Sequence, residues 1–323
     1  MSDRAAVEAA LLETQAFMEE TLDVLLPRPD GPEARLLVAM RHATLGGGKR
    51  LRAFLTLQAG RLFGVDKRAL GRAAAAVECL HAYSLVHDDL PCMDDDDLRR
   101  GKPTVHRAFD EATAVLAGDA LQALAFGLIS APDIHTDPFV RAELVTRLAQ
   151  AAGPSGMVAG QMIDIATEGA APDIATITRL QRLKTGALIV FAAEAGAILG
   201  HAGTHQRHAL IGYAHDLGLA FQIAADLLDA DGAAEAMGKA AGGKDAARGK
   251  ANFVTVMGVE RARAQAALLA DQAAAHLESF DARADRLRGA KDLVDRHYGR
   301  TDCRAYPDFQ ELLAQPDIDA VMI

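Results

Sequence analysis

Apolar residues recur at helical spacing along almost the whole chain, and this periodicity restricts the possible folds more than any other feature of the sequence. No alternation of apolar and polar residues long enough for a useful strand occurs before the last few residues. Half of the residues are apolar, only 5% are aromatic and tryptophan is absent. This composition favours closely packed helices over sheets. The sequence therefore predicts an all-α protein.

Prolines and glycines divide this pattern into segments, because both residues end helices. The loops between the segments are short, and no linker separates two halves of the chain. We therefore expect a single large helical bundle of about ten or more helices around a central cavity, with the functional site in its core. The expected helices cover residues 3–25, 33–43, 51–63, 67–90, 109–130, 137–151, 155–167, 173–200, 205–231, 251–279 and 283–298.

The last part of the chain departs from this pattern. Residues 306–323 have the pattern of a helix, a turn and an apolar strand. A strand with no sheet to join cannot stabilise itself. We therefore expect one helical domain over residues 1–300 and an atypical tail over residues 301–323, which is an appended fragment that is disordered or loosely docked. A regulatory tail is the alternative.

Charge and cysteine content exclude several classes of function. The net charge of −10 argues against a nucleic-acid partner, which would need a basic face. Cys79, Cys92 and Cys303 have neither metal-ligand nor disulfide spacing, so a reducing cytoplasm is the expected location. No secretory apolar segment follows the charged start of the chain. The longest apolar stretch, around residues 185–200, contains Glu194 and is too short for a membrane span.

Residues 87–104 carry the strongest chemical signal. Two sets of carboxylates, Asp88 with Asp89 and then residues 94–97, come directly before Arg99, Arg100 and Lys102. Mg²⁺ prefers one or two carboxylates together with substrate phosphates, and arginine binds phosphate through two parallel hydrogen bonds. A solvated acidic run at a helix end is the alternative. Because the charges are sorted by sign and follow an apolar helix, we predict a site for a diphosphate and its metal ions.

The geometry of this motif follows from Pro91. The preceding residues are helical by pattern, and Pro91 prevents the helix from continuing regularly. Asp88 and Asp94 are too far apart to share a face of a regular helix, but a bulge at residues 90–93 would turn both toward one cavity. Ser84 lies one helical turn before Asp88. Ser84 and its neighbour Tyr83 would then line the wall below the metal site.

Two further segments are weaker signals. In residues 221–229, Gln222, Asp226 and Asp229 share one helical stripe, which is either a buried polar site or a solvent-facing face. Glycines 46–48 precede Lys49 and Arg52 and could bind an anion, although an ordinary loop is the alternative.

Other residues carry less information. Residues 184–186 lie within a predicted helix, where Lys184 is either functional or a lysine that extends to solvent. Small residues one turn apart at 156 and 160 allow close helix packing. The remaining histidines with no ligand spacing are expected at the surface, and they are His42, His201, His205 and His208.

Taken together, these segments resemble the trans-type polyprenyl diphosphate synthases, and most closely the bacterial farnesyl diphosphate synthases. The order and spacing of the motifs hold from about residue 35 to residue 260, and the helical pattern fits to about residue 300. The matching segments are residues 47–52, 81–94, 98–101, 116–121, 160–164, 184–186 and 221–222.

The resemblance implies the isoprenoid synthase fold, a homodimer, and head-to-tail condensation of isopentenyl diphosphate with dimethylallyl or geranyl diphosphate to give farnesyl diphosphate. It implies up to three Mg²⁺ ions, with Asp88 and Asp94 as ligands of two. It further implies that Arg99 and Lys184 contact the allylic diphosphate, and that Thr185 and Gln222 face the allylic cation. The residues implied for isopentenyl diphosphate are Gly48, Lys49, Arg52, His81 and Arg100.

Two positions refine this expectation. Tyr83, with Ser84 beside it and two extra residues between Asp88 and Asp94, resembles the type that makes a C15 product, whereas a smaller residue would suggest geranylgeranyl diphosphate. Ala225 stands where the family has a metal-binding aspartate, which puts the third Mg²⁺ site in question. Either Asp226 (the tentative ligand) or Asp229 reaches that ion, or turnover falls, or the chain is a non-catalytic homologue that binds prenyl diphosphates.

Overall fold

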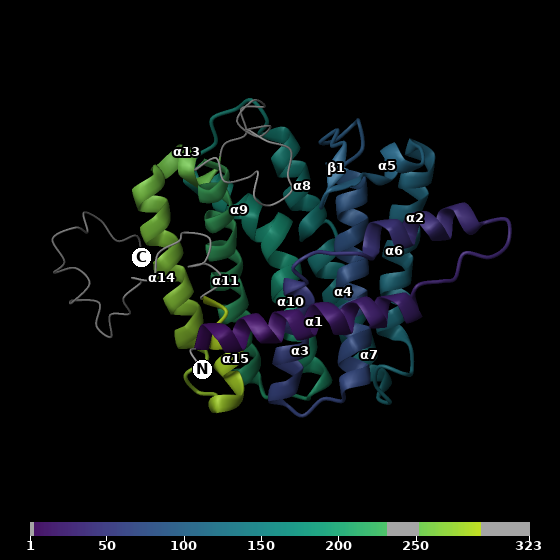
Figure 1. Ribbon diagram of the computed structural model, residues 1–323. Helices are drawn as coiled ribbons and strands as arrows, with labels where there is room; N and C mark the ends of the chain where they lie inside the picture. The colour runs from purple at the N-terminus through teal and green to yellow at the C-terminus, as the bar shows by residue number, and fades with distance from the viewer. Residues whose placement is uncertain (1–2, 231–251, 292–323) are drawn as a thin grey trace, which may run out of the picture.

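Helices make up nearly all of the regular structure in the computed structural model, which describes residues 3–230 and 252–291 (Figure 1). Within these residues the strands are confined to one short antiparallel hairpin, β1 (Leu98–Arg99) and β2 (Lys102–Pro103). The longer helices are α1 (Asp3–Leu25), α2 (Ala34–Thr44), α3 (Leu51–Leu62), α4 (Lys67–Asp88), α6 (Glu111–Ser130), α7 (Pro138–Ala152), α8 (Met157–Ala166), α9 (Ile174–Gln181), α10 (Ala187–Leu199), α11 (Thr204–Ala230) and α14 (Val259–His276). The shorter elements are α5 (Val105–Ala108), η1 (Arg182–Gly186), α13 (Phe253–Met257), η3 (Ala282–Ala284) and α15 (Asp285–Arg288).

Side-chain caps explain where many of these helices begin. An Asp or Asn carboxyl or amide oxygen accepts a hydrogen bond from a backbone N–H in the first turn, which satisfies a donor that has no partner within the helix. The capping residues are Asp66 of α4, Asp110 of α6, Asp137 of α7, Asp173 of α9 and Asn252 of α13.

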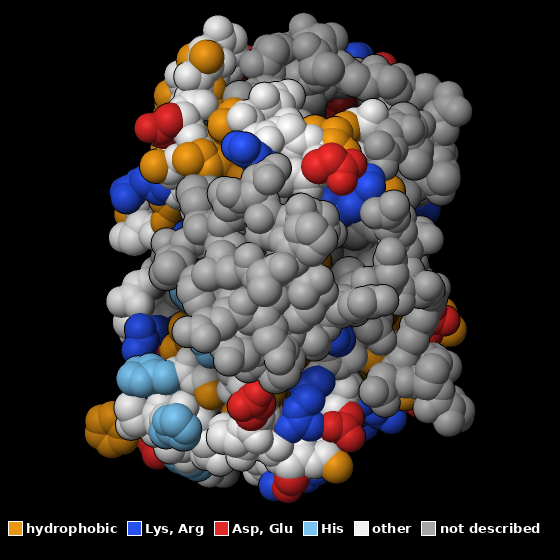
Figure 2. Space-filling model, turned by 90° about the vertical axis from the view of Figure 1, so that its left-hand side faces the viewer, with side chains coloured by type: hydrophobic (Ala, Val, Ile, Leu, Met, Phe, Trp, Pro, Cys, Tyr) orange, Lys and Arg blue, Asp and Glu red, His pale blue; other side chains and the backbone are white. Residues whose placement is uncertain are grey.

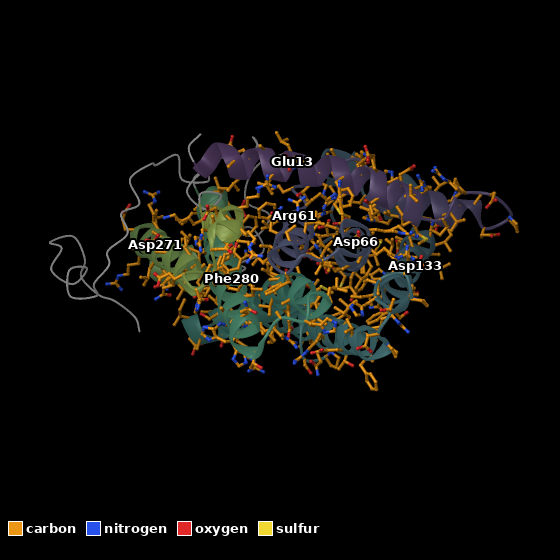
Figure 3. The ribbon with its side chains drawn as sticks, turned by 90° about the horizontal axis from the view of Figure 1, so that it is seen from below. Glu13, Arg61, Asp66, Asp133, Asp271 and Phe280 are labelled. Atoms are coloured by element: carbon orange, nitrogen blue, oxygen red, sulfur yellow. The ribbon has the colours of Figure 1, made fainter. Side chains whose placement is uncertain are left out.

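The long helices run side by side, and α1 lies across them along one side of the bundle (Figure 1). The view from below shows several of the bundle helices end-on, with Glu13 on α1 and Arg61 at the end of α3 (Figure 3). Helices α4 and α10 form the centre, since most of their residues are buried. Alanine and glycine at their contacts let the axes approach closely: a Cβ atom on Gly196 of α10 would lie 2.8 Å from the Thr56 carbonyl oxygen of α3.

The all-α bundle and most of the helix bounds are confirmed, with several differences. In place of the predicted helix over residues 283–298, the described residues form η3 and the short α15, which ends at Arg288. The predicted helix over residues 173–200 contains the π-helical segment η1 between α9 and α10. The predicted helix over residues 251–279 is interrupted at Gly258, whose φ of +84° breaks the helical path. The hairpin β1–β2 was not predicted because its strands are too short to show a pattern. Residues 301–323, the predicted tail, lie outside the described residues, as do residues 292–298 of the last predicted helix.

Helix α6 is the one described helix with the length and composition that a membrane span would require. A single such helix is weak evidence, because core helices of bundles have the same properties. Nearly half of its most apolar window is buried inside the molecule, where α6 packs against α4, α2 and α7.

Candidate active site

The sequence motifs gather at one end of the bundle, the upper end in Figure 1, where α4 leads into the hairpin and α8 lies nearby. Pro91 ends α4, and the chain then folds back on itself. The backbone N–H of Asp94 donates to the carbonyl of Asp88 at 2.8 Å, and the N–H of Met93 donates to the carbonyl of Leu90 at 2.8 Å. The predicted bulge is therefore confirmed, and it brings Asp94 beside Asp88.

Asp88 and Asp94 form the acidic part of the site. Burial, reinforced by the negative charge of Asp94, raises the pKa of Asp88 to about 6, against the opposing charge of Lys184. A buried carboxylate beside another carboxylate favours a bound cation, because the cation offsets both the desolvation and the repulsion. Two adjacent carboxylates match the part of the donor set that a protein supplies to Mg²⁺ when substrate phosphates supply the rest.

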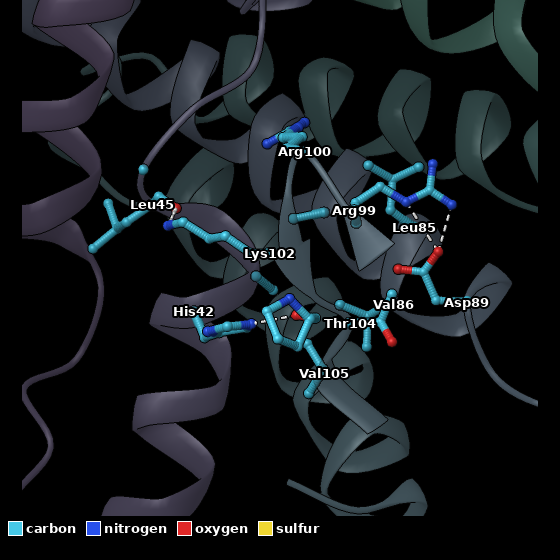
Figure 4. Close-up of a pocket in the computed structure, with 14 residues that line it drawn as sticks. His42, Leu45, Leu85, Val86, Asp89, Arg99, Arg100, Lys102, Thr104 and Val105 are labelled. Carbon is cyan, nitrogen blue, oxygen red and sulfur yellow. Dashed lines mark hydrogen bonds and ion pairs between the residues drawn. The ribbon is translucent and has the colours of Figure 1, made fainter. Parts of the chain in front are cut away.

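Asp89 has a different partner from Asp88. Its carboxylate, which is buried, accepts hydrogen bonds from both Nε and Nη2 of Arg99, the first at 2.9 Å (Figure 4). Arg99 also reaches Asp96 at 3.2 Å. Although burial opposes it, the hydrogen bond with Asp89 raises the pKa of Arg99. Asp89 therefore holds Arg99 in place near Asp88.

A basic cluster lies on the other side of the hairpin. The loop before α3 has positive φ angles at Gly46 (79°), Gly47 (137°) and Gly48 (103°). At Gly48 a side chain would collide with Arg100, since a Cβ atom there would lie 2.7 Å from the guanidinium carbon. Arg100 donates to the carbonyl of Gly47 at 3.0 Å. The glycines thus let the loop lie directly against an arginine.

Two further members of this basic cluster suit an anion. The Nε of Arg52 is buried and makes no hydrogen bond within the described structure, so a ligand oxygen could be its acceptor. Burial, together with the charges of Arg52, Arg100, Arg99 and Arg50, lowers the pKa of His81 well below its usual range. His81 is therefore a neutral hydrogen-bonding group inside a cluster of guanidinium groups.

A small pocket lies between α2, α4 and the hairpin, next to this cluster (Figure 4). His42 Nε2 is 2.7 Å from the carbonyl oxygen of Pro103 on one side of it, and Lys102 Nζ donates to the carbonyl of Leu45 at 3.4 Å. His42 is thus half-buried against the hairpin, while His201, His205 and His208 are exposed as expected.

The opposite wall comes from η1 and α11. Lys184 donates from Nζ to Asp164 Oδ2 of α8 at 2.6 Å, and Thr185 Oγ1 lies 3.4 Å from Gln222 Oε1. A π-helical turn of this kind places an extra residue in a helix and often occurs at functional sites. Here it presents Lys184 and Thr185 side by side. The Lys49 Nζ lies 5.6 Å from the centre of the Phe221 ring, so the glycine loop faces α11 across the site.

On α11, the stripe predicted from the sequence is partly buried. Gln222 donates from Nε2 to Asp226 Oδ1 at 3.0 Å, and the other Asp226 oxygen accepts from the backbone N–H of Phe253 at 3.0 Å. Asp226 is 6% exposed. It therefore ties α13 to α11 and orients the Gln222 amide, and Ala225 beside it has no side-chain oxygen to offer a metal.

Tyr83 and Ser84 lie one turn below Asp88 on α4, as predicted. Tyr83 is buried, and its ring makes an edge contact with His87 at 5.6 Å between centroids. Ser84 Oγ donates to the carbonyl of His81 at 2.9 Å.

Comparison with known proteins shows to which family the chain belongs. A sequence model of the family described as polyprenyl synthetase matches residues 33–285. The chain belongs to the polyprenyl synthetase family. It is 43% identical to a farnesyl diphosphate synthase of Geobacillus stearothermophilus over 85% of this chain and 93% of the relative. It is 45% identical to the geranylgeranyl pyrophosphate synthase 11 of Arabidopsis thaliana over 75% of this chain and 69% of the relative.

The solved structure of a similar protein has the same fold as this polyprenyl synthetase. The apo crystal structure of an FPP/GFPP synthase from Zymomonas mobilis superposes with a TM-score of 0.81 and is 50% identical, over 90% of this chain and 99% of that one.

The carboxylates of the site fit a metal centre that takes its remaining ligands from the substrate. Among residues 3–230 and 252–291, no three carboxylate, imidazole or thiol side chains lie close enough together to hold a metal ion by themselves. The polyprenyl synthetase family uses Mg²⁺ with isopentenyl and allylic diphosphates, and Mg²⁺ takes part of its ligands from such phosphates. Asp88 and Asp94 therefore fit the role of its protein ligands.

Sequence reasoning missed two residues of the site. Asp164 belongs to the matching segment 160–164, for which the sequence predicted no role, yet it is the ion-pair partner of Lys184. Asp89 was grouped with Asp88 as a metal carboxylate, but it pairs with Arg99. The signal for Asp164 was present, because it lies one turn after Gln161 on a predicted helix. Its contact with Lys184 depends on how α8 packs against η1.

Proposed function

We propose that this polyprenyl synthetase joins isopentenyl diphosphate to dimethylallyl and then geranyl diphosphate, and so makes farnesyl diphosphate. The observation that supports this most is the presence, at one end of the bundle, of two clusters that suit a diphosphate, one through metal ions and the other directly. Asp88, Asp94 and Lys184 form one, and the glycine loop with Arg52 and Arg100 forms the other. Two diphosphates held in this way would have their hydrocarbon parts between them.

The allylic diphosphate is the substrate that ionises. Asp88 and Asp94 would hold it through Mg²⁺, and Arg99 and Lys184 would contact it directly. The Mg²⁺ ions, when bound, supply positive charge for the departing diphosphate. Lys184 and Arg99 add charge from fixed positions, since Asp164 and Asp89 orient them.

The allylic cation would then face the Thr185 and Gln222 oxygens, which lie 3.4 Å apart and can stabilise positive charge. Isopentenyl diphosphate would be held by Gly48, Lys49, Arg52, His81 and Arg100, with its double bond close to the cation. Proximity then supplies part of the rate, and the apolar walls exclude water that would otherwise trap the cation. The departing diphosphate would accept the final proton.

Product length depends on the floor of the site. Tyr83 fills the space below Asp88 with a buried ring, which supports a C15 product, and Ser84 lies beside it. A longer product is the second candidate, because a geranylgeranyl pyrophosphate synthase of Arabidopsis and the FPP/GFPP synthase of Zymomonas are both similar to this chain.

The third metal ion is the weakest part of the predicted site. Asp226 stays the tentative ligand, although two hydrogen bonds already engage its oxygens; a carboxylate has further lone pairs for a metal. If neither Asp226 nor Asp229 reaches this ion, turnover is reduced. A non-catalytic homologue that binds prenyl diphosphates is the alternative, and Ala225 is the residue that favours it.

The remaining proposals concern assembly and location. Exposed apolar side chains at Val38 of α2 and at Val115 and Leu116 of α6 support a homodimer. The described part of the face in Figure 2 carries basic and acidic side chains intermingled, which supports the absence of a nucleic-acid partner. We further propose a cytoplasmic location, a helical domain over residues 1–300 and an atypical tail over residues 301–323.

One assay tests the central proposal. The purified chain is incubated with Mg²⁺, isopentenyl diphosphate and either dimethylallyl or geranyl diphosphate, and the products are separated by chain length. Farnesyl diphosphate is expected, and removal of Mg²⁺ by a chelator should abolish it. If the chain binds both substrates but forms no product, the non-catalytic alternative holds.

A further inference from the structure

Arg50 and Glu78 form a buried ion pair that has no part in the proposed chemistry. The Nη1 of Arg50 lies 3.0 Å from Glu78 Oε2, and each side chain is 3% exposed. Arg50 is the residue directly before α3, whereas Glu78 lies in the middle of α4. Burying two charges is costly, and removing one partner of such a pair leaves the other uncompensated. A pair in this position therefore needs an explanation.

The contacts of the pair join the two ends of the glycine loop. Arg50 donates from Nη2 to the carbonyl of Thr44, the last residue of α2, at 2.6 Å. The second oxygen of Glu78 accepts from the backbone N–H of Ala53, in the first turn of α3, at 3.2 Å. One ion pair thus satisfies a backbone carbonyl at the end of α2 and a backbone N–H at the start of α3. The N-cap residue of α3 makes no side-chain capping hydrogen bond of its own.

The loop between these two caps carries backbone strain. Arg50 has a φ of 50°, in the left-handed region that a residue other than glycine adopts only when its surroundings impose it. Gly46 to Gly48 also have positive φ angles, so this stretch has many alternative conformations without the clamp. The rest of the loop is held by the Gly46 N–H, which donates to Glu19 Oε1 at 2.7 Å, and by the carbonyls of Leu45 and Gly47, which accept from Lys102 and Arg100 of the hairpin segment.

The charge of Glu78 also acts on the basic cluster. Burial lowers the pKa of Arg52, and Glu78 opposes that shift. Burial lowers the pKa of Arg100 as well, followed by the repulsion of Arg50, and Glu78 again opposes the shift. Glu78 thus offsets the repulsion among these guanidinium groups.

We propose that the Arg50–Glu78 pair is a positioning device for the isopentenyl diphosphate site, which fixes residues 45–50 so that Lys49 and Arg52 are placed before the substrate binds. The inference rests on the proposed function of the glycine loop. Binding to a preorganised loop avoids the cost of ordering it. Arg50 and Glu78 themselves are positioning residues, because their side chains are engaged with each other and with the backbone.

The test is Glu78→Gln, which keeps the shape and removes the charge, together with Arg50→Lys, which keeps the charge and loses the forked geometry that reaches two acceptors. We expect either change to raise the Kd and KM for isopentenyl diphosphate by about tenfold or more, because the loop must then be ordered on binding. The KM for geranyl diphosphate and kcat at saturating isopentenyl diphosphate should change less than about twofold, since Lys184 lies on another element and Asp88 is about 15 Å along α4 from Glu78. Kd is measured by calorimetry with isopentenyl diphosphate alone.

The matched control is Glu194→Gln. Glu194 is also a buried helical glutamate, 7% exposed, and pairs with Arg207 at 2.7 Å. Arg207 is near the start of α11, about 20 Å along the helix from Gln222. This control should lower the melting temperature without changing the Kd for isopentenyl diphosphate.

The outcomes separate the inference from the proposed function. If the wild type binds isopentenyl diphosphate but forms no product, the synthase proposal fails while the Kd comparison still tests the clamp. An unchanged Kd in folded Glu78→Gln or Arg50→Lys overturns the inference. An equal rise of this Kd in the control Glu194→Gln also overturns the inference. A wild type that does not bind isopentenyl diphosphate overturns it as well.

Discussion

Gly160 offers a sharp test of the idea that helix packing sets the position of Lys184, for which we propose a role in catalysis. A Cβ atom added at Gly160 of α8 would lie 2.5 Å from the Cα of Lys184 and 2.8 Å from the carbonyl carbon of Leu183, whereas ordinary contact begins at 3.4 Å. These are backbone atoms that cannot rotate away. In Gly160→Ala, α8 and η1 must therefore separate by about 1 Å, at a cost of roughly 1–3 kcal/mol of folding stability.

The functional loss should exceed the loss of stability. Lys184 and Thr185 both lie on η1, and a displacement of about 1 Å in catalytic groups can reduce the rate by about a hundredfold. We expect kcat/KM for geranyl diphosphate to fall by about this factor, while the Kd for isopentenyl diphosphate stays within twofold of wild type. This pattern is the reverse of the one expected for Glu78→Gln. Steady-state kinetics and calorimetry measure the two quantities.

The control for the methyl group itself is Gly127→Ala. Gly127 lies on α6, and an added Cβ atom there has nothing within 4 Å. Alanine in place of glycine within a helix stabilises by about 0.5–1 kcal/mol, so this variant should melt slightly higher and keep its activity. A Gly160→Ala protein that is folded at the assay temperature and retains wild-type kcat/KM would refute the reasoning, because the close contact would then not position Lys184.

Three further changes test other parts of the site and its surroundings. Ala225→Asp should raise kcat by about tenfold and lower the Mg²⁺ concentration needed for half-maximal rate, because it adds a carboxylate for the third ion; an unchanged Mg²⁺ dependence would exclude a missing ligand at this position. Tyr83→Ser should shift the products beyond C15, since the buried ring no longer blocks the floor, and chromatography of the dephosphorylated products would show it; an unchanged C15 product would contradict the proposed role of Tyr83. Leu116→Glu should halve the mass measured by light scattering, because it places a charge on the exposed apolar face of α6, and an unchanged mass would remove α6 from the proposed interface.

The helices could be predicted from the sequence because their apolar spacing and their breakers are local properties. The bulge after Asp88 was predictable for the same reason, since Pro91 prevents a regular helix wherever it occurs. The sequence did not predict that Asp89, unlike its neighbour Asp88, pairs with Arg99. This pairing depends on the direction in which α4 ends and on the hairpin that brings Arg99 back to Asp89.

Contacts between distant segments account for the rest of what the sequence did not show. The π-helical turn at η1 has the composition of an ordinary helix, and the close contact with Gly160 of α8 becomes visible only in the packed structure. Asp226 had the pattern of a metal ligand, yet one of its partners is the backbone of Phe253. No spacing rule connects a carboxylate to a backbone amide on a later helix.

The π-helical turn also has a consequence for how this chain tolerates insertions and deletions. It marks the place where α9 and α10 together hold one residue more than a regular α-helix requires. Loss of one residue between Arg182 and Gly186 would leave a continuous, fully hydrogen-bonded helix, and the faces of α9 and α10 would keep nearly the same relation, because a residue in the wider π turn advances less around the axis than a residue in a regular helix. Ile177 and Leu180, which are buried on α9, would then stay in the core, whereas the widened turn that holds Lys184 and Thr185 would be lost. Loss of a single residue here should therefore harm the site more than the fold.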